Sequence, residues 1–294
     1  MRLSFASAPA TDSSTAKDAA QGAFQAPNDV RVAMVVEQMW QPVPGGSGTY
    51  ITNLAHSLRA QGVKVAGIAA RRSHNDPGSS AVGLETMPVR YANLPRPALY
   101  ESWNRLHSPL AEAILPASDL VHATTWAIPP TRKPLVVTVH DLAFLRNPEH
   151  FTKRGNSYFR KSLQRTIKEA QAVIVPSQAT ADDCYEAGIN PERVHVIPHG
   201  VSVQEVSASQ IDLFRTAYGL SRPYVLWTGT REPRKNLPGL LHAFSRIAGE
   251  FPQLDLVLVG PSGWGDDAVE RQLIQAIGTS RVHVLGHLAQ DTLQ

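Results

Sequence analysis

The stretch Tyr224-Val-Leu-Trp-Thr-Gly-Thr-Arg-Glu-Pro-Arg-Lys-Asn236 joins a short apolar run to a glycine and a cluster of basic residues. The apolar run is typical of a buried strand, and apolar residues at helical spacing over 237–249 predict an amphipathic helix directly after it. Arg231, Arg234 and Lys235 are therefore expected beside a helix N-terminus, where free N–H groups already favour an anion. The stretch predicts a phosphate or diphosphate site within an alternating α/β pattern.

The alternation continues on both sides of this stretch. On the C-terminal side we expect strands at 254–259 and 282–285 and a helix at 267–277. On the N-terminal side the expected strands are 31–36, 63–70, 85–89, 120–123, 135–139, 172–176 and 194–197. The expected helices there are 49–61, 102–115, 152–171 and 179–187. This order predicts the α/β class, with two Rossmann-like, doubly wound parallel-sheet domains.

The domain boundaries follow from changes in composition along the chain. Residues 1–29 are rich in Ala, Ser, Thr, Asp and Pro without apolar periodicity, which predicts a disordered tail. The first domain is expected at 30–202 and the second domain at 223–294. Residues 203–222 between them are expected to form a linker that contains a short helix near 212–218. The second domain is expected to be incomplete, because its three strands and two helices make half of a mononucleotide-binding sheet.

Composition narrows the classes of function. The 294 residues are 43% hydrophobic with a net charge of +3, which falls short of the clustered basic excess of a nucleic-acid binder. One cysteine, Cys184, excludes an internal disulfide and favours a reducing compartment, so we expect a cytoplasmic protein. No apolar stretch reaches the length of a membrane span. The basic helix at 152–171 favours a solvated face and leaves open a peripheral contact with an anionic inner membrane surface.

A glycine-rich segment, Gly45-Gly-Ser-Gly48, follows the first expected strand. Glycines tolerate positive φ, so Gly45, Gly46 and Gly48, together with Ser47, are expected to expose backbone amides toward a phosphate. The spacing matches neither the P-loop nor the G-x-G-x-x-G fingerprint. A plain strand-to-helix turn is the alternative, because glycine is a common turn residue.

A titratable pair, His140-Asp141, follows the expected strand at 135–139. Open α/β sheets bind their ligands at the carboxyl ends of their strands, so this position favours a functional histidine. A purely structural histidine at the end of the sheet is the alternative interpretation. The pair His195 and His199 is not expected to bind a metal, because Pro198 between them excludes helical i, i+4 geometry.

Five motifs in order resemble the retaining nucleotide-sugar glycosyltransferases of family 4. They are Gly-Gly-Ser-Gly at 45–48, Thr-Val-His-Asp at 138–141, Val-Pro-Ser at 175–177, Val-Ile-Pro-His-Gly-Val at 196–201 and Gly-Thr-Arg-Glu-Pro-Arg-Lys-Asn at 229–236. The resemblance covers residues 31–294, and the fifth motif is the most specific. It implies the GT-B architecture, in which two Rossmann-like domains face a cleft, with the donor held mainly by the second and the acceptor by the first.

The resemblance also implies roles for the matched residues. Lys235 matches the family's lysine on the donor diphosphate, and Arg234 is expected to supply the accompanying arginine charge, ahead of Arg231. The segment around Gly46 is expected to touch the diphosphate, and His140 to lie near the transferred sugar. His199 stands where the family usually has asparagine. The further donor or acceptor contacts expected from the matched motifs are Ser177, His199 and Gly200.

The implied reaction moves a hexose, mannose or glucose, from a nucleotide-diphosphate sugar to a hydroxyl of a lipid, glycan or small molecule with retention. The chain has no Asp-x-Asp, so protein cations are expected to replace a metal, and no cofactor is expected. The family's Glu-x7-Glu segment is expected beyond residue 294, which leaves a non-catalytic nucleotide-sugar-binding remnant as the alternative. An NAD-dependent dehydrogenase is disfavoured, because its G-x-G-x-x-G is absent.

Overall fold

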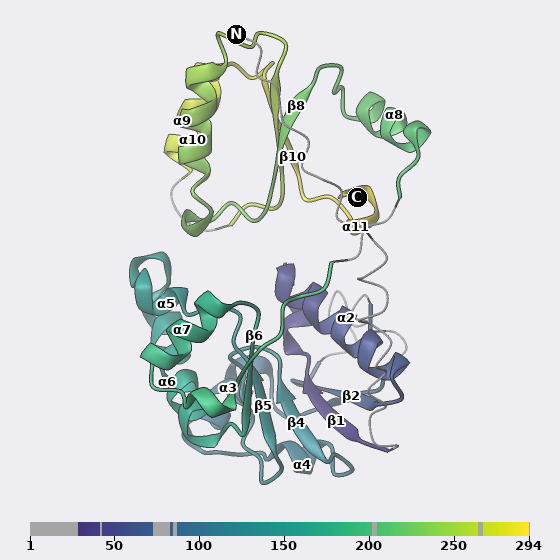
Figure 1. Ribbon diagram of the computed structural model, residues 1–294, viewed down its shortest axis with the longest axis vertical. Helices are drawn as coiled ribbons and strands as arrows, with labels where there is room; N and C mark the ends of the chain where they lie inside the picture. The colour runs from purple at the N-terminus through teal and green to yellow at the C-terminus, as the bar shows by residue number, and fades with distance from the viewer. Residues whose placement is uncertain are drawn as a thin grey trace.

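The computed structural model describes residues 29–41, 43–72, 83–84, 87–201, 205–263 and 267–293. These residues form two units, one around a seven-stranded sheet and one around a three-stranded sheet. Figure 1 shows the two units stacked along the long axis of the molecule, with the larger sheet below. Two parallel α/β sheets confirm the predicted fold class. The predicted tail, apart from its last residue, and residues 202–204 at the predicted domain boundary lie outside the described ranges.

The large sheet has the strand order β3-β2-β1-β4-β5-β6-β7, and all its neighbouring strands are parallel. The chain steps outward from β1 to β2 and β3, then returns to the other side of β1 with β4. This reversal between β1 and β4 is the switch point at which open α/β sheets form a ligand crevice. The strands are β1 (Arg31–Val35), β2 (Lys64–Ala69), β3 (Val89–Tyr91), β4 (Leu120–Ala123), β5 (Leu135–Thr138), β6 (Ala172–Val175) and β7 (Val194–Val196).

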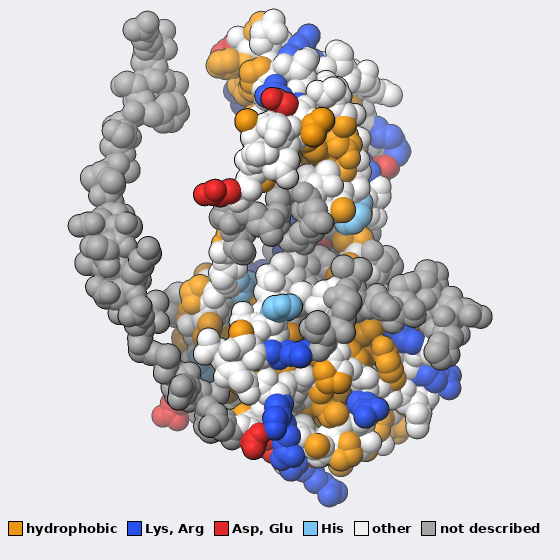
Figure 2. Space-filling model, turned by 90° about the vertical axis from the view of Figure 1, so that its right-hand side faces the viewer, with side chains coloured by type: hydrophobic (Ala, Val, Ile, Leu, Met, Phe, Trp, Pro, Cys, Tyr) orange, Lys and Arg blue, Asp and Glu red, His pale blue; other side chains and the backbone are white. Residues whose placement is uncertain are grey.

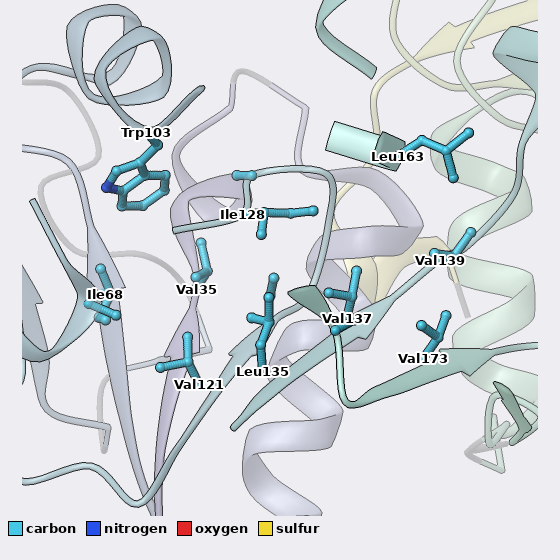
Figure 3. Close-up of a cluster of buried hydrophobic side chains, with 14 of the residues drawn as sticks. Val35, Ile68, Trp103, Val121, Ile128, Leu135, Val137, Val139, Leu163 and Val173 are labelled. Atoms are coloured by element: carbon cyan, nitrogen blue, oxygen red, sulfur yellow. The ribbon is translucent and has the colours of Figure 1, made fainter. Parts of the chain in front are cut away.

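Helices cover both faces of the large sheet, as Figure 1 shows. Because side chains alternate along a strand, each strand supplies residues to two cores. One core packs the sheet against α3, α5, α6 and α7, and Figure 3 shows Val35, Val121 and Val137 pointing into it beside Trp103. The other core packs against α2. The helices are α2 (Gly45–Ala60), α3 (Arg96–Arg105), α4 (Ala111–Ile114), α5 (Ala143–Arg146), α6 (Lys153–Glu169) and α7 (Gln178–Glu186), with 3-10 turns η1 (Glu37–Trp40), η2 (Pro148–His150) and η3 (Pro191–Arg193).

The second unit has the strand order β10-β9-β8, again parallel. Its core lies between the sheet and the helices α9 and α10, where Leu241, Phe244 and Leu258 are buried. Helix α8 lies on the opposite side of the sheet in Figure 1. The elements are α8 (Ala208–Ala217), β8 (Tyr224–Thr228), η4 (Pro233–Lys235), α9 (Leu237–Ile247), β9 (Asp255–Val259), α10 (Ala268–Ile277), β10 (Val282–Gly286) and α11 (Gln290–Leu293).

Several helices differ from the sequence predictions, and the short helices α5 and α11 were not predicted. Helix α2 begins at Gly45 rather than at residue 49, so it includes the whole glycine-rich segment. The helix predicted at 102–115 is two helices, and α3 already begins at Arg96. Helix α8 begins four residues before the predicted short helix, because Ser207 and Gln210 form a capping box at its N-terminus.

One side chain of the basic helix is not on a solvated face. Arg165 of α6 is buried, and its guanidinium donates to the Ile128 carbonyl at 2.6 Å and to Glu169 at 2.8 and 3.0 Å. The other basic residues of this helix, including Arg160 and Lys161, are exposed, as expected for a solvated face. Among the described residues, no helix is both long and apolar enough to cross a bilayer.

Candidate active site

The glycine-rich segment forms the first turn of α2, immediately beyond β1 at the switch point of the large sheet. Gly45 has φ of +61°, so it takes the left-handed conformation that the sequence predicted. Of the three glycines that could tolerate positive φ, Gly46 and Gly48 do not use it and follow the helix. A Cβ on Gly48 would lie 2.4 Å from the Pro44 Cβ, so this glycine is required by packing inside the turn.

The start of α2 still presents backbone donors. In the described part of the chain, the amides of Gly45, Gly46 and Ser47 donate no hydrogen bond, as expected for the first residues of a helix. Gly45 and Gly46 are exposed and Ser47 is half-buried. These N–H groups, together with the positive end of the helix dipole, suit an anion.

His140 lies directly after β5, at the carboxyl edge of the large sheet. Its Nε2 lies 3.0 Å from the Thr124 carbonyl oxygen, and a carbonyl only accepts, so Nε2 carries the proton. Its Nδ1 lies 3.3 Å from His199 Nε2, the residue that replaces the family's asparagine. Thr124 therefore fixes the tautomer of His140 and directs its other nitrogen toward the loop after β7.

Three further polar residues support this histidine. Thr138 lies within a quoted motif that gave it no role, and spacing along the sequence did not single out Tyr50 or His122. The Tyr50 ring packs edge-on against the His140 ring with centroids 5.0 Å apart, and it lies 4.8 Å from the His199 ring. The Tyr50 hydroxyl is 3.0 Å from the Thr138 Oγ1, which is 2.8 Å from His122 Nε2. The polar positions 122 and 138 within otherwise apolar strands were the signal that could have identified them.

Burial controls the charge of the two inner histidines. It lowers the pKa of His122 to about 4, with a smaller contribution from His140. Burial also lowers the pKa of His140, and His199 acts in the same direction, while the Thr124 carbonyl and Asp141 oppose the shift. Both imidazoles are therefore neutral near pH 7. A neutral His140 offers an acceptor lone pair on Nδ1 to a hydroxyl that displaces His199.

The basic stretch at 229–236 forms the loop between β8 and α9. Gly229 donates to the Val259 carbonyl at 2.9 Å, and a Cβ on Gly260 would lie 1.8 Å from the Gly229 oxygen. The two loops therefore touch backbone to backbone. Asn236 ends the turn in the left-handed conformation, and its side chain accepts from the Gly239 amide at 3.3 Å as the N-cap of α9.

Arg231 is tied into the second unit. Its Nη1 lies 2.8 Å from Glu270 Oε1 on α10, and its Nη2 lies 2.6 Å from the Ser262 hydroxyl. Its backbone amide donates to Pro261, which pairs the loops after β8 and β9. These contacts give Arg231 a role in holding the basic loop in place.

Arg234 and Lys235 remain on the surface of the same loop. Arg234 donates to Glu232 Oε1 at 2.8 Å, and its Nη1 lies 3.9 Å from Asp141 Oδ2 of the first unit. Lys235 is exposed, and its side chain has no hydrogen bond or ion pair with any other described residue. Its Cε lies 3.8 Å from the position of a Cβ on Gly229. The structure thus brings the basic loop and the His140-Asp141 pair together across the gap between the units.

Two predicted contact residues lie outside this cluster of interactions. The Ser177 hydroxyl accepts from the Thr180 amide at 3.2 Å and caps α7. Gly200 is exposed and a Cβ there would touch nothing within 4 Å. No contact among the described residues joins either of them to His140. The described residues also contain no group of three or more His, Cys, Asp or Glu side chains placed to hold a metal ion.

A groove leads away from His140 along the first unit. Its volume is about 860 Å³, and it passes Ser47 of α2 and Trp126 after β4 before it runs between α3 and α6. Tyr100 of α3 and Tyr158 of α6 form part of its wall. The groove therefore connects the start of α2, His140 and Asp141 with a longer recess in the same unit.

Residues 44–205, more than half of the chain, match the family model for Glycosyltransferase Family 4. The chain belongs to glycosyltransferase family 4. It is 26% identical over 205 residues to O-antigen chain mannosyltransferase B of Escherichia coli, an alignment that covers 67% of this chain and 54% of the relative. It is 29% identical over 252 residues to alpha-maltose-1-phosphate synthase of Mycolicibacterium smegmatis, covering 78% and 60%. The chain thus spans little more than half the length of these curated relatives.

Solved structures show the same architecture. The crystal structure of Anabaena HepE in complex with UDP and glucose superposes with a TM-score of 0.63 and 22% identity, covering 90% of this chain and 71% of that one. WaaG, a glycosyltransferase involved in lipopolysaccharide biosynthesis, superposes with a TM-score of 0.63 and 17% identity, covering 89% and 71%. At these identities the likeness establishes the fold, and the fold is GT-B.

Proposed function

We propose that this chain acts in the transfer of a hexosyl group, mannosyl or glucosyl, from a nucleotide-diphosphate sugar to a hydroxyl acceptor with retention of configuration. The observation that carries the proposal is the approach of Arg234 to Asp141, 3.9 Å apart. This approach supports a donor site to which the exposed Lys235, the free amides of α2 and His140 all contribute. Mannosyl and maltosyl products in the names of the relatives, and UDP and glucose in a neighbour's title, agree with a hexose donor.

The chemistry follows from where charge develops. As the bond between the anomeric carbon and the diphosphate oxygen breaks, negative charge grows on the leaving group. Arg234, Lys235 and the start of α2 would stabilise that charge more strongly than the charge of the bound donor, which lowers the barrier. The acceptor oxygen forms its bond to the same face of the carbon, and its proton passes to the departing phosphate oxygen.

His140 would orient the sugar rather than exchange protons. Its Nε2 proton is engaged by the Thr124 carbonyl, and its lowered pKa keeps Nδ1 as an acceptor. A sugar hydroxyl that takes the place of His199 would donate to Nδ1. Such a contact fixes the anomeric carbon relative to the diphosphate, which is a positioning effect.

Substitution of Lys235 by Ala tests the diphosphate contact. We expect turnover to fall by about 100-fold or more, the loss found when one donor to a developing anion is removed. Release of nucleoside diphosphate from UDP-glucose and GDP-mannose, with saccharide acceptors, provides the measurement. Arg246→Ala is the matched control, because Arg246 is an exposed cation of α9 without a described partner. Unchanged turnover in Lys235→Ala would refute the role of this lysine.

The same assay separates transfer from a binding-only role. A chain that binds nucleotide sugars but releases no nucleoside diphosphate with any acceptor would fit the non-catalytic alternative. Clear turnover by this chain would exclude that alternative.

A further inference from the structure

We propose that Gln38 is a positioning residue for the donor: its side chain holds the start of α2 so that the amides of Gly45, Gly46 and Ser47 face the diphosphate. The inference rests on the proposed transferase function, because it concerns the donor site of that reaction. Gln38 lies in η1, the turn directly after β1, and lines the same groove as Ser47 and His140.

Helix α2 begins without the side-chain cap that several other helices have. In α6, α7, α8 and α9, a side-chain oxygen of the N-cap residue accepts a hydrogen bond from an amide of the first turn. The N-cap of α2 is Pro44, whose side chain has no polar atom. A capping oxygen takes up one of the N–H groups that would otherwise face an anion. A support that leaves these amides free must therefore contact another atom of the turn.

Gln38 provides such a support. Its Nε2 donates to the Pro44 carbonyl oxygen at 3.0 Å, and the same oxygen accepts from the Gly48 amide at 3.2 Å. A carbonyl oxygen has two lone pairs, so it accepts both hydrogen bonds at once. Gln38 thus holds the start of α2 through an acceptor. The amides of residues 45–47, which donate to no other described residue, stay available to a ligand.

The planarity of the peptide bond carries this restraint to the ligand side. The Pro44 carbonyl and the Gly45 N–H belong to one planar trans unit, so they point in opposite directions. Gly45 has the left-handed φ of +61°, and glycine restricts the orientation of its neighbouring peptide planes less than other residues do. The hydrogen bond from Gln38 therefore sets the direction in which the Gly45 N–H faces a ligand.

The turn that carries Gln38 is itself anchored to the large sheet. Glu37, the residue before it, is 1% exposed. Its carboxylate accepts from the Ala70 amide at 2.7 Å and pairs with Arg72, and both of these residues follow β2. Because Glu37 ties η1 to the end of β2, Gln38 reaches Pro44 from a fixed position rather than from a free loop.

The test compares nucleoside diphosphates with monophosphates, because only the former carry the second phosphate. Gln38→Met keeps the length of the side chain and removes its donor. Calorimetry with UDP and UMP, and with GDP and GMP, measures the affinities of the 294-residue chain. We expect Gln38→Met to weaken diphosphate binding at least about threefold, the effect of losing one hydrogen bond between neutral groups, and to leave monophosphate binding unchanged.

Gln41→Met is the matched control. Gln41 lines the same groove, and its side chain has no hydrogen bond within the described residues. Nitrogen-15 NMR of the ligand-free chain provides a measurement without nucleotide. The Gly45 and Gly46 amide signals should shift in Gln38→Met and stay in place in Gln41→Met.

Two results would overturn the inference while leaving the transferase function standing. One is an unchanged ratio of diphosphate to monophosphate affinity in Gln38→Met, even if its melting temperature falls, because Gln38 would then have only a structural role. The other is an unchanged Gly45 amide signal in the ligand-free variant. A parent chain that binds UDP and GDP no more tightly than UMP and GMP would overturn the proposed donor site, and the role of Gln38 in it as well.

Discussion

At the scale of single residues, His122 links the site to the stability of the large sheet. It is 4% exposed, and burial lowers its pKa to about 4 from a reference of 6.5. Above pH 6.5 the imidazole is neutral in both the folded and the unfolded chain. Below pH 6.5 His122 takes up a proton in the unfolded chain but stays neutral in the folded chain. The free energy of unfolding therefore decreases as the pH falls toward 4. We expect His122 to lower the free energy of unfolding by about 2 to 3 kcal/mol between pH 7 and pH 4.5.

Denaturant unfolding at the two pH values measures this dependence. His122→Asn removes the titrating group and keeps a polar side chain opposite Thr138, so its stability should change less between pH 7 and pH 4.5 than that of the parent. The difference between the two proteins isolates His122 from the carboxylates that also protonate in acid. An identical pH dependence in both proteins would show that His122 has the same pKa in the folded and the unfolded chain.

Gly260 is the residue on which the basic loop depends. A Cβ there would lie 1.8 Å from the Gly229 oxygen, and its φ of +142° is itself unfavourable for other residues. Gly260→Ala should therefore push the loops after β8 and β9 apart, destabilise the second unit by about 2 kcal/mol or more and weaken UDP binding. Gly249→Ala is the control, since a Cβ at Gly249 meets nothing within 4 Å. Thermal unfolding measures the stability, and calorimetry measures the affinity for UDP. An unchanged melting temperature and an unchanged UDP affinity in Gly260→Ala would show that the two loops can separate freely.

At the scale of elements, the N-cap of α7 tests what Ser177 does. Ser177→Ala should cost about 1 kcal/mol of stability, because the Thr180 amide loses its acceptor. Ser177→Asp keeps a capping oxygen and should retain stability to within a few tenths of a kcal/mol. Nucleoside diphosphate release then separates the roles. A stable Ser177→Asp variant that loses turnover would identify Ser177 as a ligand contact as well as a cap.

The elements with strong local signals were the ones the sequence predicted well. Strand β4 has the predicted bounds, Leu120–Ala123, and α7 lies within one residue of the helix predicted at 179–187. The start of α2 was misplaced because glycines are poor helix formers, yet Gly48 is needed for its contact with Pro44. The basic helix at 152–171 was assigned a solvated face as a whole, and Arg165 is the exception because its partner, the Ile128 carbonyl, is distant in sequence.

The candidate site was predictable only in part, because some of its contacts join residues that are distant in sequence. The basic loop and His140 were found because each is a compact motif at the end of a strand. The contacts of Tyr50 with Thr138 and of Thr138 with His122 join three separate elements. The polar positions 122 and 138 within apolar strands are visible in the sequence, but the sequence does not show which side chains they meet. The ion pair of Arg231 with Glu270 spans 39 positions, so the sequence could not separate this structural cation from Lys235.

At the scale of the whole molecule, one face of the second unit is apolar and exposed. Leu213 of α8 is 71% exposed and Leu226 of β8 is 49% exposed, and both line a hollow of about 550 Å³. Figure 2 shows hydrophobic side chains gathered on this side of the upper unit. Exposed apolar patches of this kind bind hydrophobic molecules.

We expect the native chain to enhance the fluorescence of the dye ANS. Replacing Leu213 and Leu226 together by Glu should lower that signal at least about twofold with little change in stability, because surface substitutions usually stay within about 0.5 kcal/mol. Leu106→Glu is the control, since Leu106 is 74% exposed in the other unit. If Leu106→Glu lowers the fluorescence as much as the double variant does, the dye does not bind specifically to the apolar face of the second unit.

The position of β1 in the middle of the large sheet has a consequence for biosynthesis. Val32 pairs with Val65 on one side but with Leu120 on the other, 88 positions later. At a translation rate of roughly 5 to 20 residues per second, the second edge of β1 stays without its partner strand for about 4 to 18 seconds after β1 is made. During that interval the nascent chain exposes the hydrogen-bonding edge of a strand with four buried residues, an edge that other chains could pair with.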